Sequence, residues 1–470
     1  MAAAHFVFVP LMAQGHLIPA VDTALLLATH GAFCTVVATP ATAARVRPTV
    51  DSARRSGLPV RLAEFPLDHA GAGLPEGVDN MDNVPSEFMA RYFAAVARLR
   101  EPVERHLLLR ADEGGAPPPD HNVERFGAYD GVADDNAPVV VPGLARRVEV
   151  TRAQAPGFFR DIPGLEKFAD DLERARAESD GVVINTVLEM EPEYVAGYAE
   201  ARGMKLWTVG AGRALPPEHR DAGGKGEHRR HRRRRVPPVA RRQGARLRRL
   251  RQLREHRAPG GKPGGGARPR AGGFGQRFIW VVRSPDRHGE AALGFLREPE
   301  APGGAGGAPG CSSGGGRPQA LILSHRAAGA FVTHCGWNST LEAATAGLPV
   351  VAWPHFTDQF LNAKMAVEVL GIGVGVGVEE PLVYQRVRKE IVVGRGTVEA
   401  AVRSAMDGGE EGEARRWRAR ALAAKARAAA REGGSSHANL LDLVERFRPR
   451  HVAASEAANG TTAPPPPPRQ

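Results

Sequence analysis

The chain has 470 residues, with 63 Lys and Arg against 52 Asp and Glu and a formal net charge of +11. This length allows two domains with substantial cores, and no apolar run approaches the roughly 18 residues that a membrane-spanning helix needs. The first residues lack the basic stretch of a secretory signal peptide, and three cysteines without paired spacing argue against a disulfide framework. We therefore expect a cytoplasmic protein without a membrane span.

The net positive charge of the chain is concentrated in one segment. Between Arg213 and Arg270 there are 20 Lys and Arg against 4 Asp and Glu, a local net charge of +16. The rest of the chain then has a net charge of −5, because the total is +11. Arginine-rich segments also occur in nucleic-acid-binding proteins, but this one lacks interleaved aromatic residues and any nucleic-acid-binding fold signature. A basic nucleic-acid-binding protein is therefore the weakest hypothesis, and we expect no nucleic acid partner.

Apolar runs alternate with amphipathic stretches through the N-terminal half. The apolar runs predict strands at 5–11, Phe33–Ala38 and Gly181–Thr186. Helical periodicity predicts a helix from Leu17 onward and further helices at Met89–Leu109 and Leu188–Ala201. Strands and helices that alternate at this spacing predict βαβ units and a parallel sheet.

The C-terminal part repeats this alternation. Strands are predicted at Arg277–Val282 and Ala330–Val332, and helices at Asn338–Gly347, Gly408–Arg431 and His437–Phe447. The Pro-rich tail after Ala453 predicts disorder. The fold class predicted for the whole chain is α/β.

Three stretches interrupt the alternation. Residues 114–121 run from a helix into a Pro-rich loop without the strand that the βαβ order requires. Residues 211–273 and 299–317 consist largely of Arg, Gly and Pro, with almost no apolar periodicity. Such composition does not predict a buried core.

The most informative stretch is 331–359. An apolar strand leads into the turn His334-Cys335-Gly336, and a helix follows. A strand, a glycine turn and a helix N-terminus form an anion cradle, because backbone N–H groups and the helix dipole converge there. Asp358 and Gln359 then present a carboxylate and an amide just after a second apolar run. Groups for phosphate followed by groups for hydroxyls indicate a nucleotide-sugar donor.

The chain resembles the plant-type family of UDP-dependent glycosyltransferases that act on small molecules. Further matches lie at Gly15-His16-Leu17-Ile18-Pro19 and at Asn185-Thr186 with Leu188-Glu189. The resemblance implies the GT-B architecture, in which two Rossmann-like domains face each other across a cleft. The positions that match the donor signature are Pro318, Gln319, His325, Phe331, His334, Gly336, Trp337, Asn338, Ser339, Glu342, Gly347, Pro349, Pro354, Asp358 and Gln359.

His16 stands at the junction of a strand and a helix, with Pro19 expected in the first helical turn. A helix dipole disfavours imidazolium, so a neutral His16 is available as a general base toward an acceptor hydroxyl. From the residues alone a capping or structurally satisfied histidine is the favoured interpretation; the resemblance favours the base.

The resemblance also implies roles in donor binding. His334 is expected to contact a phosphate, and Asn338 and Ser339 to hold the diphosphate. Glu342 is expected to bind ribose hydroxyls, although Ser339 and Glu342 also have capping-box spacing. Asp358 and Gln359 are expected to bind sugar hydroxyls, with the glutamine indicating glucose; a solvated helix start is their alternative. Gln319, Gly336 and Trp337 complete the predicted donor site.

Cys335 next to His334 could indicate a thiol nucleophile or a metal ligand. No second cysteine or suitably spaced histidine supports either role, so we expect no metal site. Trp337 and Trp353 are interpreted as wall and core residues rather than catalysts.

The chain departs from the family at three places. Gly316 and Arg317 replace a Trp-Ala pair whose Trp stacks on uracil, and the strand with a catalytic Asp is missing near Asp120. The basic segment can be explained by a shift of the reading frame. When residues 227–254 are back-translated with GC-rich codons and the nucleotide sequence is then translated one base later, the resulting peptide can end in VVYVSFG. This peptide matches the first strand of the donor domain in the family. Residues 311–316 shift in the same way, and we interpret these segments as frame-shifted translation. Transcript sequencing that shows the printed frame throughout would exclude this.

The predicted function is inverting transfer of glucose from UDP-glucose to a hydroxyl of a small lipophilic acceptor by a monomer without a cofactor. A catalytically impaired pseudoenzyme, or a faulty gene model, is the alternative. The predicted divisions are an acceptor-binding domain at 1–205, a linker and disrupted start of the donor domain at 206–273, a UDP-sugar-binding domain at 274–435, a helix at 436–451 and a tail at 452–470.

Overall fold

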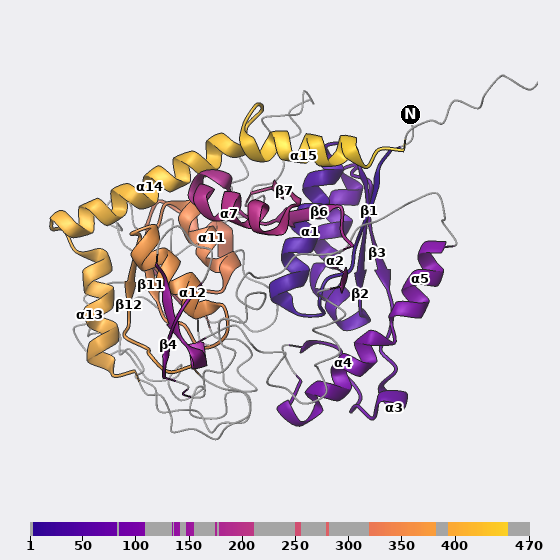
Figure 1. Ribbon diagram of the computed structural model, residues 1–470, viewed down its shortest axis with the longest axis horizontal. Helices are drawn as coiled ribbons and strands as arrows, with labels where there is room; N and C mark the ends of the chain where they lie inside the picture. Colours follow the sequence, from indigo (N-terminus) through magenta and orange to yellow (C-terminus); the bar gives the residue numbers. More distant parts are fainter. Residues whose placement is uncertain are drawn as a thin grey trace, which may run out of the picture.

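A computed structural model describes residues 3–81, 84–108, 134, 136–141, 147–154, 174–175, 178–210, 250–254, 279–281, 319–381 and 393–449. A parallel sheet forms in each half of the chain, with helices packed against it (Figure 1). This confirms the predicted α/β class. Within the described ranges, no helix has the length and apolar content to cross a bilayer.

The N-terminal sheet has the order β1-β2-β3 and is parallel. Its strands and connecting helices are β1 (His5–Phe8), α1 (Gln14–Thr29), β2 (Phe33–Ala38), α2 (Pro40–Arg55) and β3 (Val60–Glu64). β1 is shorter than predicted, and His5 is its only buried residue. α1 begins three residues before the predicted Leu17, so Pro19 lies in its second turn rather than in its first.

The predicted helix at Met89–Leu109 is two helices, α4 (Met89–Ala97) and α5 (Arg100–Leu108). They follow the short α3 (His69–Ala72) and a 3-10 turn η2 (Ser86–Phe88). The chain turns at Arg98, whose guanidinium pairs with Asp68 at 3.0 Å, and Leu99 is buried in the same cluster as Met89. Because Leu99 continues the apolar spacing of α4, the periodicity gave no sign of the break.

Two small sheets follow. β4 (Pro138–Val140) and β5 (Glu149–Thr151) are antiparallel, whereas β6 (Gly181–Ile184) and β7 (Lys205–Thr208) are parallel. The predicted helix at Leu188–Ala201 is a 3-10 turn, η4 (Leu188–Met190), followed by α7 (Pro192–Arg202). Pro192 explains the division, because proline is favoured at the start of a helix and not within one.

The C-terminal sheet is parallel, with the strand order β12-β11-β10-β8-β9. Its strands are β8 (Leu250–Arg254), β9 (Ile279–Val281), β10 (Ala328–Thr333), β11 (Val350–Ala352) and β12 (Gly373–Gly375). β8 lies within the basic segment, whose composition predicted no buried core. It lies where the shifted reading places VVYVSFG, at 248–254, while the shifted reading itself stays a prediction.

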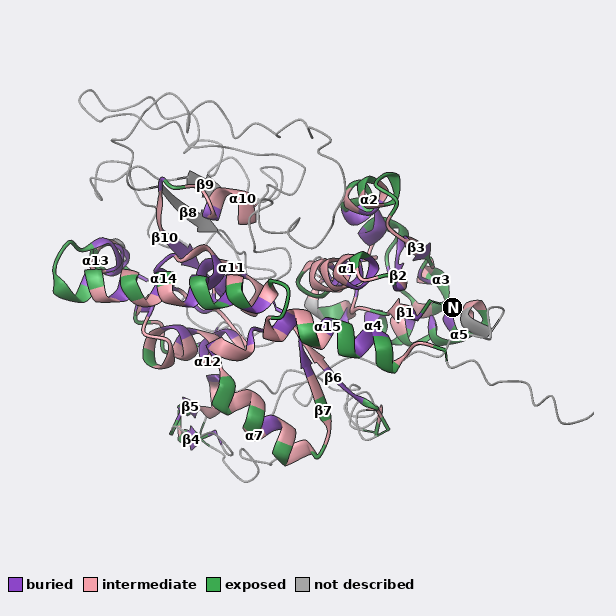
Figure 2. Ribbon diagram, turned by 90° about the horizontal axis from the view of Figure 1, so that it is seen from above, coloured by how far each residue is buried: buried purple, intermediate pink, exposed green. Residues whose placement is uncertain are grey.

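Helices cover this second sheet. They are α10 (Gln319–Leu323), α11 (Trp337–Ala346), α12 (Gln359–Lys364), a π-helical turn η7 (Met365–Val369) and α13 (Arg395–Met406). α11 begins and ends one residue before the predicted bounds, and its C-cap Gly347 has a φ of 74°, a left-handed conformation that favours glycine. Buried residues gather on β10 and along α11 (Figure 2).

The last two helices join the two halves. α14 (Glu410–Ala430) packs on α11, and α15 (Ser435–Arg446) continues along the same edge to the N-terminal sheet (Figure 1). Leu440 and Leu443 lie in the core of the N-terminal half, whereas Val187 and Met190 lie in that of the C-terminal half. The chain therefore exchanges segments between the halves, and the predicted residue boundaries of the domains stay predictions.

Candidate active site

The predicted anion cradle is built by the turn between β10 and α11. Cys335 adopts φ of 63°, in a region that few residues other than glycine occupy, and its backbone N–H donates to Thr333 Oγ1 at 3.3 Å. The turn ends at Gly336, which is the N-cap of α11. The first backbone N–H groups of a helix have no partner within the helix, so this end of α11 is suited to an anion.

Gly336 is needed because of the neighbouring histidine ring. A Cβ added at this position would overlap Nε2 of His334, although φ of −57° and ψ of 137° are open to any residue. The His334 ring therefore lies directly over Gly336. The absence of a side chain at Gly336 fixes where the imidazole can sit beside the N-terminus of α11.

We expect Gly336→Ala to displace the His334 ring and to raise the Kd of UDP by about 10-fold or more, the size of one lost hydrogen bond to a charged group. Titration calorimetry with UDP measures the change. Gly396→Ala is the control, because a Cβ at this helical glycine meets nothing within 4 Å. Equal affinities in the two variants would contradict the role of Gly336.

The predicted capping box between Ser339 and Glu342 does not form. The N-cap is Gly336, so Ser339 is already the third residue of the helix. Glu342 Oε2 instead accepts a hydrogen bond from Nε2 of Gln319 at 2.8 Å, and Ser339 Oγ accepts from the same nitrogen at 3.3 Å. The amide of Gln319 thus joins α10 to the first turns of α11, and the carboxylate is held at the edge of the cradle.

Asp358 and Gln359 lie where α12 begins, and both are held firmly. Gln359 is only 5% exposed, which excludes a solvated helix start, and its side-chain oxygen accepts from the N–H of His355 at 2.9 Å. Asp358 accepts from Asn362 Nδ2 at 2.7 Å. The oxygen of Gln359 is occupied, so its amide nitrogen is the group that can serve a ligand. Burial lowers the pKa of His355 to about 4, so this imidazole is neutral at physiological pH.

His16 lies in the first turn of α1 and is exposed. Its neighbour Gly15 connects it to the cradle, because Nδ2 of Asn338 donates to the Gly15 carbonyl at 2.7 Å. Oδ1 of Asn338 accepts from Nδ2 of Asn185 at 2.9 Å, and the Asn185 carbonyl accepts from Trp337 Nε1 at 2.8 Å. The structure therefore brings the helix of His16 and the helix of the cradle together through Asn338.

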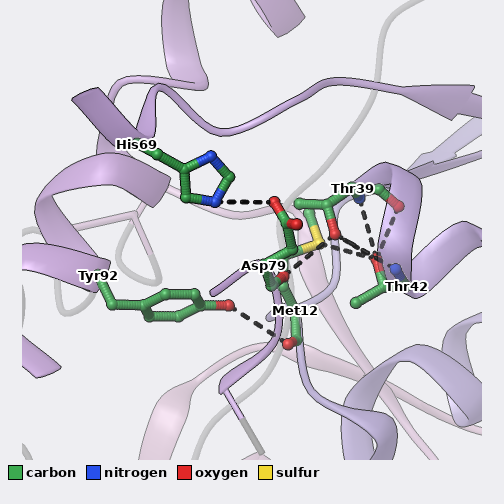
Figure 3. Close-up of polar contacts among 6 residues, drawn as sticks. All are labelled: Met12, Thr39, Thr42, His69, Asp79 and Tyr92. Atoms are coloured by element: carbon green, nitrogen blue, oxygen red, sulfur yellow. Dashed lines mark hydrogen bonds and ion pairs between the residues drawn. The ribbon is translucent and has the colours of Figure 1, made fainter. Parts of the chain in front are cut away.

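Figure 3 shows a polar cluster that the sequence did not reveal. Thr39 in it directly follows β2, and Met12 lies in the turn after β1. Thr39 Oγ1 donates to the Asp79 carbonyl at 3.1 Å, and the Asp79 carboxylate lies 3.2 Å from Nε2 of His69. Tyr92 donates its hydroxyl to the Met12 carbonyl at 3.3 Å. The carboxyl edge of a parallel sheet is where ligands bind in open α/β folds. These partners are spread along the chain from Met12 to Tyr92 without a shared motif, so no pattern in the sequence predicted them.

Cys335 is fully buried, and burial raises the pKa of its thiol to about 12. A thiol nucleophile must form a thiolate, so this environment opposes the nucleophile interpretation. Burial raises the pKa of Cys34 to about 12 as well. We expect a Cys311→Ser variant to show no titratable thiol with an aromatic disulfide reagent at pH 8 until urea unfolds it. Rapid labelling of the folded protein would contradict this.

Several predicted features lie outside the described residues. These are the position of Asp120 in 114–121, Gly316 and Arg317, the segments 211–249 and 299–317, and the tail after 449. The roles predicted for Asp120 and for the missing uracil-stacking Trp stay sequence-based predictions.

Comparison with known proteins gives one consistent result. A family model described as UDP-glucoronosyl and UDP-glucosyl transferase matches residues 317–380. UDP-glycosyltransferase 73D1 of Arabidopsis thaliana is 32% identical over 499 residues, covering 94% of this chain and 96% of its own length. UDP-glycosyltransferase 73E1 of Stevia rebaudiana is 35% identical over 494 residues, covering 94% of this chain and 95% of its own length.

Solved structures are similar over the same extent. Glycyrrhiza uralensis UGT73P12, complexed with glycyrrhetinic acid 3-O-monoglucuronide, superposes with a TM-score of 0.76 at 25% identity, covering 95% of this chain and 96% of its own. Medicago truncatula UGT71G1, complexed with UDP-glucose, gives a TM-score of 0.68 at 18% identity, covering 95% and 99%. At that lower identity the second likeness concerns the fold alone.

Proposed function

The chain belongs to the plant UDP-glycosyltransferases, GT-B enzymes that transfer sugars to small-molecule acceptors, and on this premise we propose that it uses UDP-glucose and a lipophilic acceptor. The acceptor would be a flavonoid, another phenol, a terpenoid or a hormone that carries a free hydroxyl group. The observation that supports the proposal is the hydrogen bond from Asn338 to the Gly15 carbonyl, because it joins the first turn of α1, which holds His16, to the first turn of α11.

In the proposed reaction His16 is the general base. The acceptor O–H bond breaks as its proton moves to the imidazole, and the oxygen forms a new bond to the anomeric carbon of glucose. The bond from that carbon to the β-phosphate oxygen breaks on the opposite face, so the configuration inverts. Because the helices of His16 and of the cradle are joined by the hydrogen bond from Asn338 to Gly15, acceptor and donor can be held in line.

The leaving UDP is a dianion or trianion, and the cradle is proposed to stabilise it. The N-terminus of α11 provides partial positive charge, and His334 lies beside it, against Gly336. Ser339 and Asn338 lie in the same first turn of α11 and are proposed to face the diphosphate; the side-chain amide of Asn338 is itself bonded to the Gly15 carbonyl and to Asn185. UDP-glucose is a co-substrate in this proposal, which includes no cofactor.

The remaining donor contacts follow from the held side chains. Glu342 is proposed to accept hydrogen bonds from the ribose hydroxyls, with Gln319 fixing its carboxylate. Asp358 is proposed to accept from glucose hydroxyls, and the amide nitrogen of Gln359 to donate to one. The oxygen of Gln359 is bonded to the backbone of His355, which fixes the direction of that amide.

The test is turnover by the purified full chain. UDP-glucose is incubated with a panel of flavonols, simple phenols and triterpenoids, and products are identified by mass spectrometry, with UDP-galactose and UDP-glucuronate as competing donors. We expect glucosides as the main products. A main product from another donor would contradict the glucose assignment. Calorimetric binding of UDP without any transfer would support the pseudoenzyme alternative instead.

A further inference from the structure

The carbonyl group of Gly15 has no donor available at the usual helical position. In an α-helix the carbonyl of one residue accepts from the N–H of the residue four positions later. For Gly15 that residue is Pro19, which lies inside α1 and has no N–H. The proline ring also crowds the carbonyl of the residue four positions earlier, which tilts it away from the helix axis. The sequence thus prepares an outward-facing acceptor one residue before His16.

Asn338 supplies the donor from the other half of the molecule. Its Nδ2 lies 2.7 Å from the Gly15 oxygen, a short and favourable distance for an N–H···O bond. Its Oδ1 accepts from Asn185 at 2.9 Å, so the amide is held at both ends and its orientation is fixed. Asn185, at the end of β6, is itself anchored, because its carbonyl accepts from the indole of Trp337.

We propose that Pro19, Asn185 and Asn338 form a latch that sets the position of His16 relative to the donor cradle. The latch joins the first turn of α1 to the first turn of α11, where the leaving diphosphate is proposed to lie. Asn185 and Pro19 are positioning residues: they contact neither substrate in this proposal and act through His16. The inference rests on the proposed function, because it requires that His16 is the base and that the donor binds at the N-terminus of α11.

The expected effect follows from how strongly transfer depends on alignment. Displacement of a reacting group by about 1 Å costs on the order of 10²-fold in rate. Loss of the Asn185 side chain frees the Asn338 amide to rotate, and restoration of an N–H at residue 19 draws the Gly15 carbonyl back toward its own helix. Neither substitution replaces a residue of α11 or of the His334–Gly336 turn. The latch therefore predicts a fall in kcat with little change in UDP binding.

The chain offers a matched control for the proline. Pro48 also lies inside a helix, α2, and likewise deprives the carbonyl four positions earlier, that of Ala44, of its helical donor. Pro48 and Ala44 are both exposed, and neither belongs to the site. Pro19→Ala and Pro48→Ala both restore an N–H and raise helix propensity. The two variants differ in the carbonyl that regains a helical donor. In Pro19→Ala it is the Gly15 carbonyl, which accepts from Asn338, whereas in Pro48→Ala it is the Ala44 carbonyl, which lies outside the site.

The experiment compares Asn185→Ala, Pro19→Ala and Pro48→Ala in the full chain. We expect kcat to fall roughly 10- to 100-fold for the first two, with the Kd of UDP changed by less than about 3-fold and Pro48→Ala within about 2-fold of wild type in both. A Pro19→Ala variant that behaves as Pro48→Ala does, or an Asn185→Ala variant with unchanged kcat, would overturn the proposal. So would a loss of UDP binding in proportion to kcat, since that indicates damage to the cradle.

A second measurement does not need turnover. Hydrogen–deuterium exchange of peptides that cover α1 and α11 is expected to be at least about 3-fold faster in Asn185→Ala than in wild type, and unchanged in Pro48→Ala. If wild type transfers no sugar but shows this exchange pattern, the latch stands and the proposed function fails. If wild type is active and the exchange is unaffected, the latch fails alone.

Discussion

Replacement of His16 by alanine is expected to lower glucosyl transfer by about 10²- to 10⁴-fold, the contribution of a positioned general base. The imidazole is exposed in the first turn of α1, so its loss leaves no cavity and exposes no core residue. UDP binding should stay within about 2-fold of wild type, because the cradle is built from β10 and α11. Initial rates at saturating UDP-glucose, together with calorimetry for UDP, measure both quantities.

His30 provides the control for this experiment. It is the C-cap residue at the opposite end of the same helix, and its Nδ1 lies 2.9 Å from the Leu26 carbonyl. His30→Ala removes an imidazole from the C-terminal end of α1, where the ring lies against His437 and away from the cradle, so it should leave transfer nearly unchanged. Equal losses in the two variants would show that an intact α1 matters and that His16 is not the base. Full activity of His16→Ala would exclude the proposed mechanism.

The donor cradle could be predicted closely because it is local. Residues from Thr333 to Gly347 form one strand end, one turn and one helix, and the bounds of α11 differ from the expected ones by one residue at each end. The turn chemistry is contained in neighbouring residues, with Gly336 as the position that admits the His334 ring. Local patterns of this kind are what a sequence states most directly.

The contacts that connect the cradle to His16 could not be predicted. Asn338 meets Gly15 across 323 residues and Asn185 across 153, and nothing in the spacing of an apolar pattern encodes such pairs. The same limit applies to Pro19, which local reasoning placed in the first turn. Only the observed start of α1 at Gln14 shows that Pro19 lies in the second turn and leaves the Gly15 carbonyl without its helical donor.

The position of β8 bears on whether the printed chain is the active one. β8 pairs with β10 on one side and β9 on the other, so it is an inner strand of a parallel sheet. Such sheets are covered on both faces, and their strands typically read as continuous apolar runs. The printed residues 250–254 read LRQLR, whereas the shifted reading gives YVSFG at the same five positions, preceded by two valines at 248–249. The more apolar sequence of the shifted frame therefore falls on the residues that form β8. For this reason we expect replacement of the printed residues by that sequence to have a large effect on stability.

A full chain in which VVYVSFG replaces the printed RRLRQLR at 248–254 is expected to be more stable, by on the order of 3 kcal/mol. The reason is that an inner parallel strand loses charged residues and gains β-branched and aromatic ones. Each 1.4 kcal/mol changes the ratio of folded to unfolded protein by about tenfold, so turnover per mole of chain should rise with it. Urea unfolding followed by circular dichroism, and transfer from UDP-glucose, measure the two effects.

The same seven residues placed at 229–235, where the printed sequence is RRHRRRR, separate strand formation from simple removal of charge. This control removes more positive charge from the same basic segment but leaves β8 as printed. If frame-shifted translation explains the segment, only the replacement at 248–254 raises the urea midpoint and the turnover. If the printed chain already equals the replaced one in both, LRQLR is compatible with an inner strand and the frame-shift hypothesis is wrong. If both replacements stabilise equally, the relevant quantity is the net charge of the segment, and the coincidence with β8 carries no weight.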